Sequence, residues 1–244
     1  MMRAFLSVCF LLLGASAHAQ ELPTLSLDLN TTGGPQELAT TLQVLMGLTV
    51  LSMAPAIILM TTAFTRIVIV LAFVRQAMGT QSSPPNQVLI GLAMFLTFFV
   101  MTPVLDRVNE TALQPYMENT ITQEEALSAA LVPMREFMFS QTAESDLAVL
   151  LSMAGREQPR TRMDVPTLTL IPAFMLSELK RAFEMGFLIY IPFLVIDMIV
   201  ASVLMAMGML MLPPPIISLP FKLLLFVLVD GWNLVVASLL KSFQ

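Results

Sequence analysis

The sequence predicts an all-α membrane protein made of kinked helical hairpins, with a small helical insert outside the membrane. Composition is the first observation behind this class: 57% of the 244 residues are hydrophobic and 12% are charged, whereas soluble domains have roughly 45–50% and 25%. The second observation is that the apolar residues gather in tracts of membrane-spanning length. The net charge of −5 leaves no basic patch for phosphates, which excludes nucleic acid as a partner.

Residues 1–19 have the pattern of a cleavable signal peptide. Arg3 provides a positive start, and residues 4–13 form an apolar core that is too short to span a bilayer. An A-x-A cleavage site at residues 17–19 precedes Gln20. The alternative is an uncleaved anchor helix, which the short core and the small flanking residues disfavour.

Cleavage would leave residues 20–43 as an exported N-terminal tail. It would also remove Cys9 and His18, the only cysteine and the only histidine. A chain without them forms no internal disulfide, binds no zinc through Cys or His, and builds no Cys–His or Ser–His nucleophile. We therefore expect no metal, no cofactor and no enzymatic activity.

Residues 44–105 predict the first helical hairpin. The apolar tract 36–76 would be about 60 Å long as one helix, twice the hydrocarbon core. It must therefore bend, and Pro55 is the expected kink. Residues 76–87 contain a Ser-Ser-Pro-Pro-Asn run and predict a loop, and residues 88–105 are again long enough to span a bilayer.

Residues 106–171, the insert, predict a polar helical segment. Between residues 106 and 184 the chain carries 7 basic and 12 acidic side chains, which is typical of a water-exposed region. Thr122 and Glu125 have the spacing of a capping box, so a helix is expected to begin there. Thr142 is expected to cap a second helix.

Residues 172–244 predict the second helical hairpin. Its first helix is expected over residues 174–211 with a kink at Pro192, and the prolines at 213–215 end it. Its last helix is expected over residues 219–240. A cleaved signal peptide puts the tail outside, so four crossings would put both hairpin turns inside and the insert outside.

Methionine is the sharpest local feature. The chain contains 20 methionines, and four of them alternate just before the prolines: Met205, Met207, Met209 and Met211. A spacing of two scatters side chains around a helix but aligns them on an extended segment. Methionine is soft and unbranched, so such a row could line a constriction. The alternative is ordinary lipid-facing or core methionine.

Isolated charges lie within the apolar tracts. Asp197 and Asp230 lie at similar distances from the prolines, so antiparallel helices would bring them to similar depth, where each needs a partner. Lys222 does not match that depth within a simple hairpin, and it could meet an aspartate of another helix or subunit. Arg66 is a further candidate. These charges predict a polar pathway or an intersubunit lock, or alternatively a structural ion pair.

A second group of charges lies near the start of the helix expected over residues 174–211. Glu178 and Arg181 are three residues apart and Lys180 and Glu184 are four apart, so both pairs can close on a helix surface. The pattern is most typical of a solvated helix start, and the alternative is that Glu178 is a buried charge or a subunit contact.

Seven motifs are spread over the chain: FTRIVIV at 64–70, RQAMGT at 75–80, PPNQVL at 84–89, PAFMLSEL at 172–179, AFEMGF at 182–187, LPFKL at 219–223 and VDGW at 229–232. Together they resemble the FliP family of flagellar biosynthetic proteins. The resemblance extends over about residues 50–243, and it is weakest in residues 109–165 and in the tail.

The resemblance implies a core subunit of the flagellar type III protein export gate. Such subunits form a homopentamer that assembles with FliQ and FliR into an oligomeric export channel, with FlhB and FlhA as neighbours. Unfolded flagellar export substrates would pass through it. The location implied is the bacterial inner membrane within the flagellar basal body, with the insert in the periplasm. The apolar helices of this family need not be ordinary bilayer spans.

The resemblance also implies a pore gasket. FliP proteins carry a methionine-rich loop that seals the closed pore, and alignment on the prolines and LPFK places it on Met209, Leu210 and Met211, with Met207 just before. Many relatives have three consecutive methionines there. Leu210 departs from that pattern, so a seal of two methionines and one leucine is expected.

Other functions compete with this interpretation. An ion-coupled transporter or proton channel would use Asp197 and Asp230. The equivalent gate subunit of a virulence type III secretion system would share the architecture, but such relatives generally lack a cleaved signal and have a shorter insert. No P-loop or other nucleotide motif is present in the sequence, so energy would come from other components.

Overall fold

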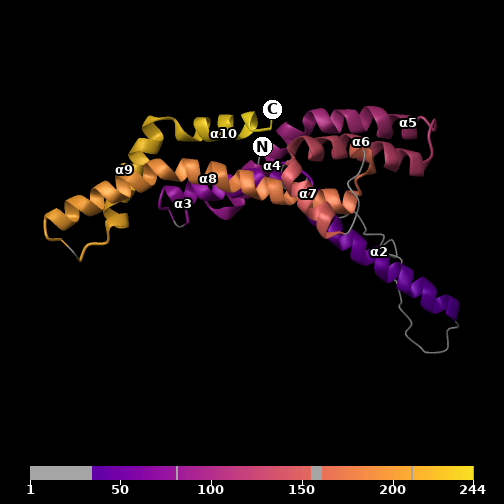
Figure 1. The fold of residues 1–244 in the computed structure, drawn as a ribbon, viewed down its shortest axis with the longest axis horizontal. Coiled ribbons are helices and arrows are strands. Elements are labelled where there is room, and N and C mark those ends of the chain that lie inside the picture. The colour runs from indigo at the N-terminus through magenta and orange to yellow at the C-terminus, as the bar shows by residue number, and fades with distance from the viewer. Residues whose placement is uncertain (1–34, 81, 155–160, 210, 244) are drawn as a thin grey trace, which may run out of the picture. The chain divides into compact units, whose positions relative to one another are not determined.

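The computed structural model describes residues 35–80, 82–154, 161–209 and 211–243. The signal peptide and the first part of the tail lie outside them, as does Leu210. The regular elements of the described residues are all helical (Figure 1). They are α2 (Pro35–Met60), α3 (Phe64–Ala77), α4 (Asn86–Val108), a π-helical turn (Asn109–Leu113), α5 (Gln114–Met117), α6 (Gln123–Gln141), α7 (Glu144–Met153), a 3-10 turn (Arg162–Asp164), α8 (Thr167–Ala206), α9 (Pro214–Leu228) and α10 (Gly231–Lys241).

The chain divides into two compact units within α2, residues 1–52 and residues 53–244. Three helical stretches are long and apolar enough to cross a membrane: Thr41–Met60, Asn86–Met117 and Thr167–Ala206. The bent pair α9–α10 makes a fourth if it is taken as one span. The predicted all-α membrane class is therefore confirmed, while the division into two hairpins and an insert stays a prediction.

The first long apolar tract is broken, but not at the proline where we expected it to bend. α2 continues through Pro55 and ends at Met60, so Pro55 does not break it. The break falls at Thr61 and Thr62, whose hydroxyls donate to the carbonyls of Ile57 at 3.0 Å and Leu59 at 3.1 Å. Threonine hydroxyls that bond preceding carbonyls offer the backbone an alternative to the helix ladder. α2 therefore ends where these threonine hydroxyls bond its last carbonyls, and not at Pro55.

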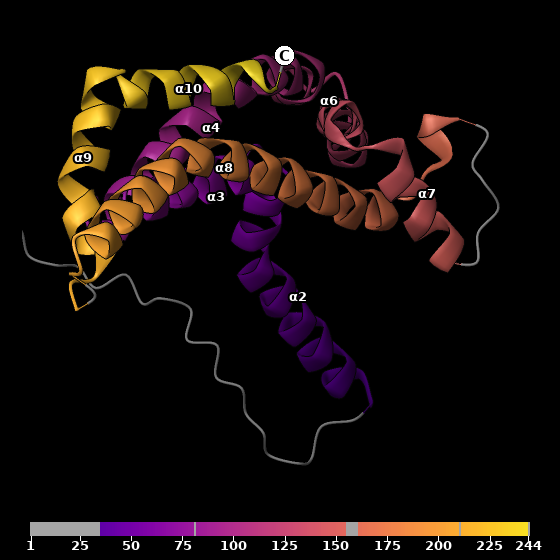
Figure 2. The same cartoon turned by 60° about the vertical axis from the view of Figure 1, so that its left-hand side comes forward.

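The core of residues 53–244 lies between α3 and α8, which run side by side in Figures 1 and 2. α3 buries Ile67, Val70, Leu71 and Val74, which are spaced as one helical face. Gly186 of α8 allows the close approach, because a Cβ there would lie 2.5 Å from Cδ2 of Phe73. The spacing of apolar residues in α3 thus determines which face meets α8.

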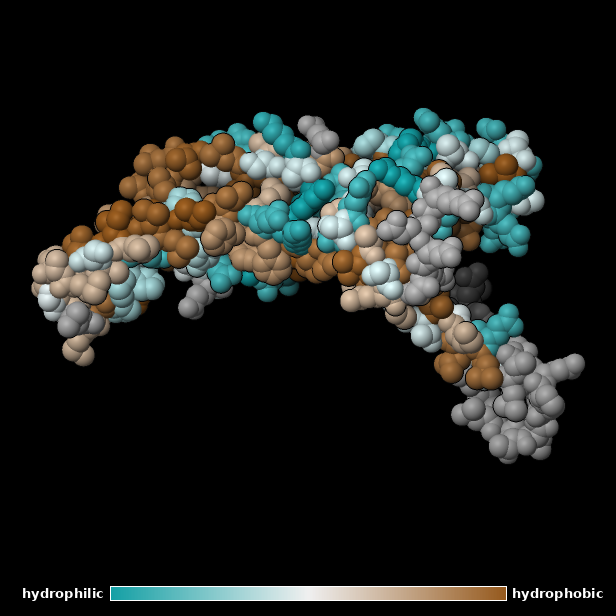
Figure 3. All heavy atoms as spheres, in the orientation of Figure 1, coloured by the Kyte–Doolittle hydropathy of each residue, from teal (hydrophilic) through white to brown (hydrophobic). Residues whose placement is uncertain are grey.

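The insert carries the polar surface. In this view hydrophilic side chains gather around α5 and α6 and over the middle of the molecule, whereas hydrophobic ones gather toward the end where α8 leads to α9 (Figure 3). α6 begins with the predicted capping box: the Thr122 amide donates to Glu125 Oε2 at 2.8 Å, and the Glu125 amide donates to Thr122 Oγ1 at 3.4 Å. This prediction is confirmed.

The prediction for Thr142 is wrong. Thr142 ends α6, and its hydroxyl donates to the carbonyl of Met138 at 2.7 Å. α7 has Ala143 at its N-cap, whose amide donates to Ser177 Oγ of α8 at 3.0 Å. A serine on another helix therefore binds the N-cap residue of α7, which has no side-chain cap of its own.

The second hairpin differs from the prediction at both helices. α8 has 40 residues, passes Pro192 without a break and ends at Ala206 rather than near residue 211. The return helix begins at Pro214 and is broken at Val229–Asp230 into α9 and α10, which are bent by 64°. Asp230 has φ 51° and ψ 52°. A left-handed residue ends α9, because it cannot continue a right-handed ladder.

Candidate functional site

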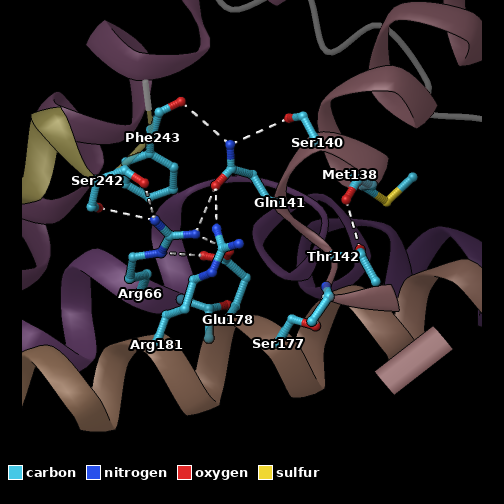
Figure 4. Close-up of polar contacts among 12 residues, drawn as sticks. Arg66, Met138, Ser140, Gln141, Thr142, Ser177, Glu178, Arg181, Ser242 and Phe243 are labelled. Carbon is cyan, nitrogen blue, oxygen red and sulfur yellow. Dashed lines mark hydrogen bonds and ion pairs between the residues drawn. The ribbon is translucent and has the colours of Figure 1, made fainter. Parts of the chain in front are cut away.

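A buried ion pair joins α3 to α8. The side chains of Arg66 and Glu178 both have 0% exposure. Arg66 Nε donates to Glu178 Oε2 at 2.9 Å, and Nη2 donates to Oε1 (Figure 4). Two parallel bonds of this kind give a bidentate pair, which is stronger and more directional than a single contact.

The other donors of Arg66 are also used. Nη1 donates to the carbonyl of Ser242 at 2.8 Å and to its hydroxyl at 2.9 Å, and Nη2 donates to Gln141 Oε1 at 3.0 Å. The ring of Phe243 lies 3.9 Å from the guanidinium carbon, within reach of a cation–π interaction. A buried charge is tolerated when its hydrogen bonds are complete, and Arg66 meets that condition.

Gln141 connects the insert to this group, which we call the Arg66 cluster (Arg66, Gln141, Glu178, Arg181, Ser242 and Phe243). Its Oε1 also accepts from Arg181 Nη1 at 2.8 Å, and its Nε2 donates to the carbonyl of Phe243 at 3.3 Å. The cluster therefore brings together α3, α6, α8 and the segment after α10. Sequence reasoning missed Gln141, Ser242 and Phe243, because no local pattern marks residues whose partners are this far away along the chain.

Of the two alternatives for Glu178, the solvated helix start is wrong. Glu178 is fully buried and pairs with Arg66 rather than with Arg181. Lys180 and Glu184, in contrast, are exposed. The reason is helical phase: Glu178 lies on the face of α8 that packs against α3, where Arg66 supplies the opposite charge.

A second ion pair joins α8 to α9. Lys222 Nζ donates to Asp197 Oδ2 at 2.5 Å, and Ser218 Oγ donates to Asp197 Oδ1 at 2.5 Å. Lys222 is 4% exposed and Asp197 is 26% exposed. The prediction that Lys222 does not match Asp197 within a hairpin is therefore wrong. The depth of a residue in a hairpin is set by its distance from the end of its own helix. Asp197 lies nine residues before the end of α8, and Lys222 lies eight residues after the start of α9, so the two are at similar depth.

Asp230 does not face Asp197. It lies exposed at the break between α9 and α10 and accepts a hydrogen bond from Asn233 Nδ2 at 3.1 Å. The two aspartates therefore do not form the matched pair of carboxylates that motivated the transporter hypothesis. The functional roles of Arg66, Glu178, Asp197, Lys222 and Asp230 stay predictions.

The methionine segment is a short loop rather than an extended row. Met205 is helical, Met207 caps α8 in a helical conformation, and Gly208 has φ +75°. The Gly208 amide donates to the Met205 carbonyl at 3.0 Å and the Met209 amide to the Leu204 carbonyl at 3.0 Å. This pair of bonds is the Schellman motif, which requires a left-handed residue such as glycine. The predicted alignment of four methionines on one side is therefore wrong.

The methionines of this loop are exposed: Met207 at 65%, Met209 at 39% and Met211 at 98%. Pro213 precedes α9 and Pro214 occupies its first position, where proline suits a helix start. Leu210 lies outside the described residues. The loop therefore has a fixed backbone on both sides and presents apolar, adaptable side chains.

An all-helical fold over the described residues, with three helical stretches of membrane-spanning length, defines this chain as an all-α membrane protein. The FliP family model matches residues 47–239. The chain is 55% identical over 217 residues to the flagellar biosynthetic protein FliP of Bacillus subtilis, which covers 89% of this chain and 98% of that protein. Proteins of the same name from Caulobacter vibrioides and Aquifex aeolicus are 53% and 45% identical, over 94% and 98% of this chain and 85% and 99% of theirs.

The chain belongs to the FliP family. Membership places it among the membrane components of the flagellar protein export apparatus, a type III secretion system. The family and the membrane class predicted from the sequence are thus both confirmed.

Proposed function

We propose that this chain is a channel-forming subunit of the flagellar export gate, and that the loop Met207–Pro213 seals the closed channel. The observation that carries the proposal is the form of this loop: exposed methionine side chains between a Schellman turn and a triple proline. Apolar constrictions exclude water and ions, and methionine adapts its shape to varied contents.

Several features of the described residues support a pore loop over ordinary lipid-facing methionine. The loop forms the turn between two apolar helices, α8 and α9. The Asp197–Lys222 pair joins these two helices about two turns away from the loop. The loop has no ionisable side chain, so water would gain little by entering a ring of such loops. The action proposed is mechanical: copies of the loop close against one another and part around an unfolded chain.

The partners belong to the same proposal. A homopentamer with FliQ and FliR, and FlhB and FlhA as neighbours, would give a ring of five loops around one axis. The bacterial inner membrane at the flagellar basal body is the proposed location, with the acidic insert on the periplasmic side. The many exposed apolar side chains of α8 and α9 support this assembly, because contiguous apolar surface on a protein marks contact with another protein or with a membrane (Figure 3).

The seal is tested with the double variant Met209→Ala and Met211→Ala. Removing both long side chains opens the constriction, so ion leakage across the inner membrane is expected to rise severalfold in cells that express the assembled gate. The matched control is Met153→Ala with Met163→Ala, which removes two methionines that are 79% and 64% exposed elsewhere. Equal leakage in wild type and the loop variant would overturn the seal.

A separate measurement tests the assembly. The complex is purified with its partners, and its mass is measured by native mass spectrometry. We expect that mass to include five copies of this chain. A monomer that associates with no partner would contradict the channel proposal as a whole.

A further inference from the structure

α10 is attached to the rest of residues 53–244 at its two ends. At its start, Asp230 has a left-handed backbone and the chain bends by 64° after α9. Just after its end, Ser242 and Phe243 contact the side chain of Arg66 (Figure 4). Figure 2 shows α10 between these points, running back from α9 toward the region of α4 and α6.

The contacts at the far end are polar and closely fitted. The Arg66 guanidinium donates to both oxygens of Ser242, and Gln141 donates to the carbonyl of Phe243. The Phe243 ring lies against the guanidinium at 3.9 Å and stacks on Phe137 with ring centroids 6.5 Å apart. The Ser242 hydroxyl in turn donates to the Leu239 carbonyl at 2.7 Å, so its orientation is fixed by α10 itself.

The apolar contact of α10 beyond the bend is narrow. Of its 11 residues, Gly231, Val235 and Leu239 are buried, and Trp232 packs edge-on against Phe226 beside the bend, with ring centroids 5.3 Å apart. Val235 and Leu239 are four apart and form a narrow stripe. If Ser242 left the cluster, Nη1 of a fully buried guanidinium would lose both of its acceptors, and an unpaired buried charged donor is far more costly than a lost apolar contact.

We propose that α10 is a hinged strap, which pivots at Val229–Asp230 and is locked in place by the latch that Ser242 and Phe243 form on Arg66 and Gln141. The latch, rather than the apolar stripe, determines where α10 lies. Because Gln141 belongs to the insert and Arg66 to α3, opening the latch would release α10 and take acceptors from both elements in one step, while the direct bond between Arg66 and Gln141 remains. This inference is independent of the proposed seal.

The position of α10 is measured by pulsed dipolar electron spin resonance on the full chain in detergent. Cys9→Ser removes the native thiol, and Ser128→Cys on α6 and Ser238→Cys on α10 provide two exposed labelling sites. Phe243→Ala is expected to broaden the distance distribution at least twofold. Phe243→Tyr keeps the ring and is expected to retain the narrow distribution.

The deciding comparison is between Phe243→Ala and Leu239→Ala. Leu239→Ala shortens the most buried apolar side chain of α10 and leaves the latch residues unchanged. Its distribution is expected to stay narrow. Broadening with Leu239→Ala but not with Phe243→Ala would show that packing holds α10, and it would overturn the proposal. A reference pair, Ser128→Cys with Lys180→Cys on α8, must stay narrow in Phe243→Ala. If the reference pair broadens too, Phe243 supports the whole unit and the strap is refuted.

Discussion

At the scale of single residues, Arg66 shows how a charge is accommodated inside an apolar protein. Its side chain is completely buried, yet every hydrogen bond that it makes ends on an oxygen of Glu178, Gln141 or Ser242. Lysine would not substitute for it, because a single ammonium group cannot reach acceptors arranged around a planar fork. The site is therefore specific for arginine.

Removing one partner of the buried pair is expected to be strongly destabilising. Glu178→Ala leaves the Arg66 guanidinium buried without its counter-charge, at a cost of about 3–5 kcal/mol. The double variant Arg66→Met with Glu178→Met buries no charge and is expected to be less destabilised than Glu178→Ala. Thermal unfolding of the purified chain in detergent measures both.

The exposed pair Arg107–Glu136 is the matched control for that prediction. Its side chains are 51% and 48% exposed, so Arg107→Ala is expected to cost about 0–1 kcal/mol. If Glu178→Ala and Arg107→Ala lowered the stability equally, burial would not be what makes the Arg66 pair important.

At the scale of elements, the contact of α3 with α8 depends on Gly186. A methyl group there would lie 2.5 Å from Cδ2 of Phe73, whose ring packs edge-on against Phe183 at 5.3 Å. Gly186→Ala is therefore expected to cost about 1–3 kcal/mol through overpacking, measured as a lower unfolding temperature.

Gly91→Ala in α4 is the counterpart, because nothing lies within 4 Å of a Cβ built there. Within a helix the change from glycine to alanine is expected to gain about 0.5–1 kcal/mol. Opposite signs for these two glycine substitutions are the expected result, and equal signs would contradict the close approach at Gly186.

The capping box of α6 gives the insert a dependence on pH. The Thr122 amide, and secondly its hydroxyl, hold the pKa of the Glu125 carboxyl below its ordinary value of 4.5. Since the folded state favours the carboxylate, this contribution to stability is full above pH 4.5 and is lost as the pH falls through the lower pKa of the folded state.

The stability difference between wild type and Glu125→Gln is therefore expected to shrink as the pH falls from about 6 to about 3. Glu124→Gln is the matched control, because the Thr122 contacts go to Glu125. Urea unfolding, followed by circular dichroism across this range, measures the difference. A difference that does not change with pH would show that the box contributes nothing through its charge.

Features determined by neighbouring residues were predictable, as the capping box shows: its signal lies within four residues. The pairing of Arg66 with Glu178 was not, because 112 residues separate them. The prediction that Lys222 and Asp197 lie at different depths was wrong for another reason. Depth was counted from the prolines, whereas α8 already ends before Gly208, so the count did not start from the true helix end.

At the scale of the whole molecule, the sequence predicted the class, the family and the presence of spanning helices. The contribution of the structure is the connection between distant segments. The Arg66 cluster joins residues from four parts of the chain, and the Asp197–Lys222 pair joins α8 to α9. These links satisfy charges that composition alone left isolated within apolar tracts.

The bend between α9 and α10 also limits where lipid can lie. At about 1.5 Å per residue, a helix of 15 residues and one of 11 are each too short for a hydrocarbon core of about 30 Å. The break leaves the start of α10 without a side-chain cap and exposes the charge of Asp230, and acyl chains offer such groups no partner. This corner of the molecule must therefore meet water, headgroups or another protein surface, so the lipid boundary cannot follow the apolar helices without interruption.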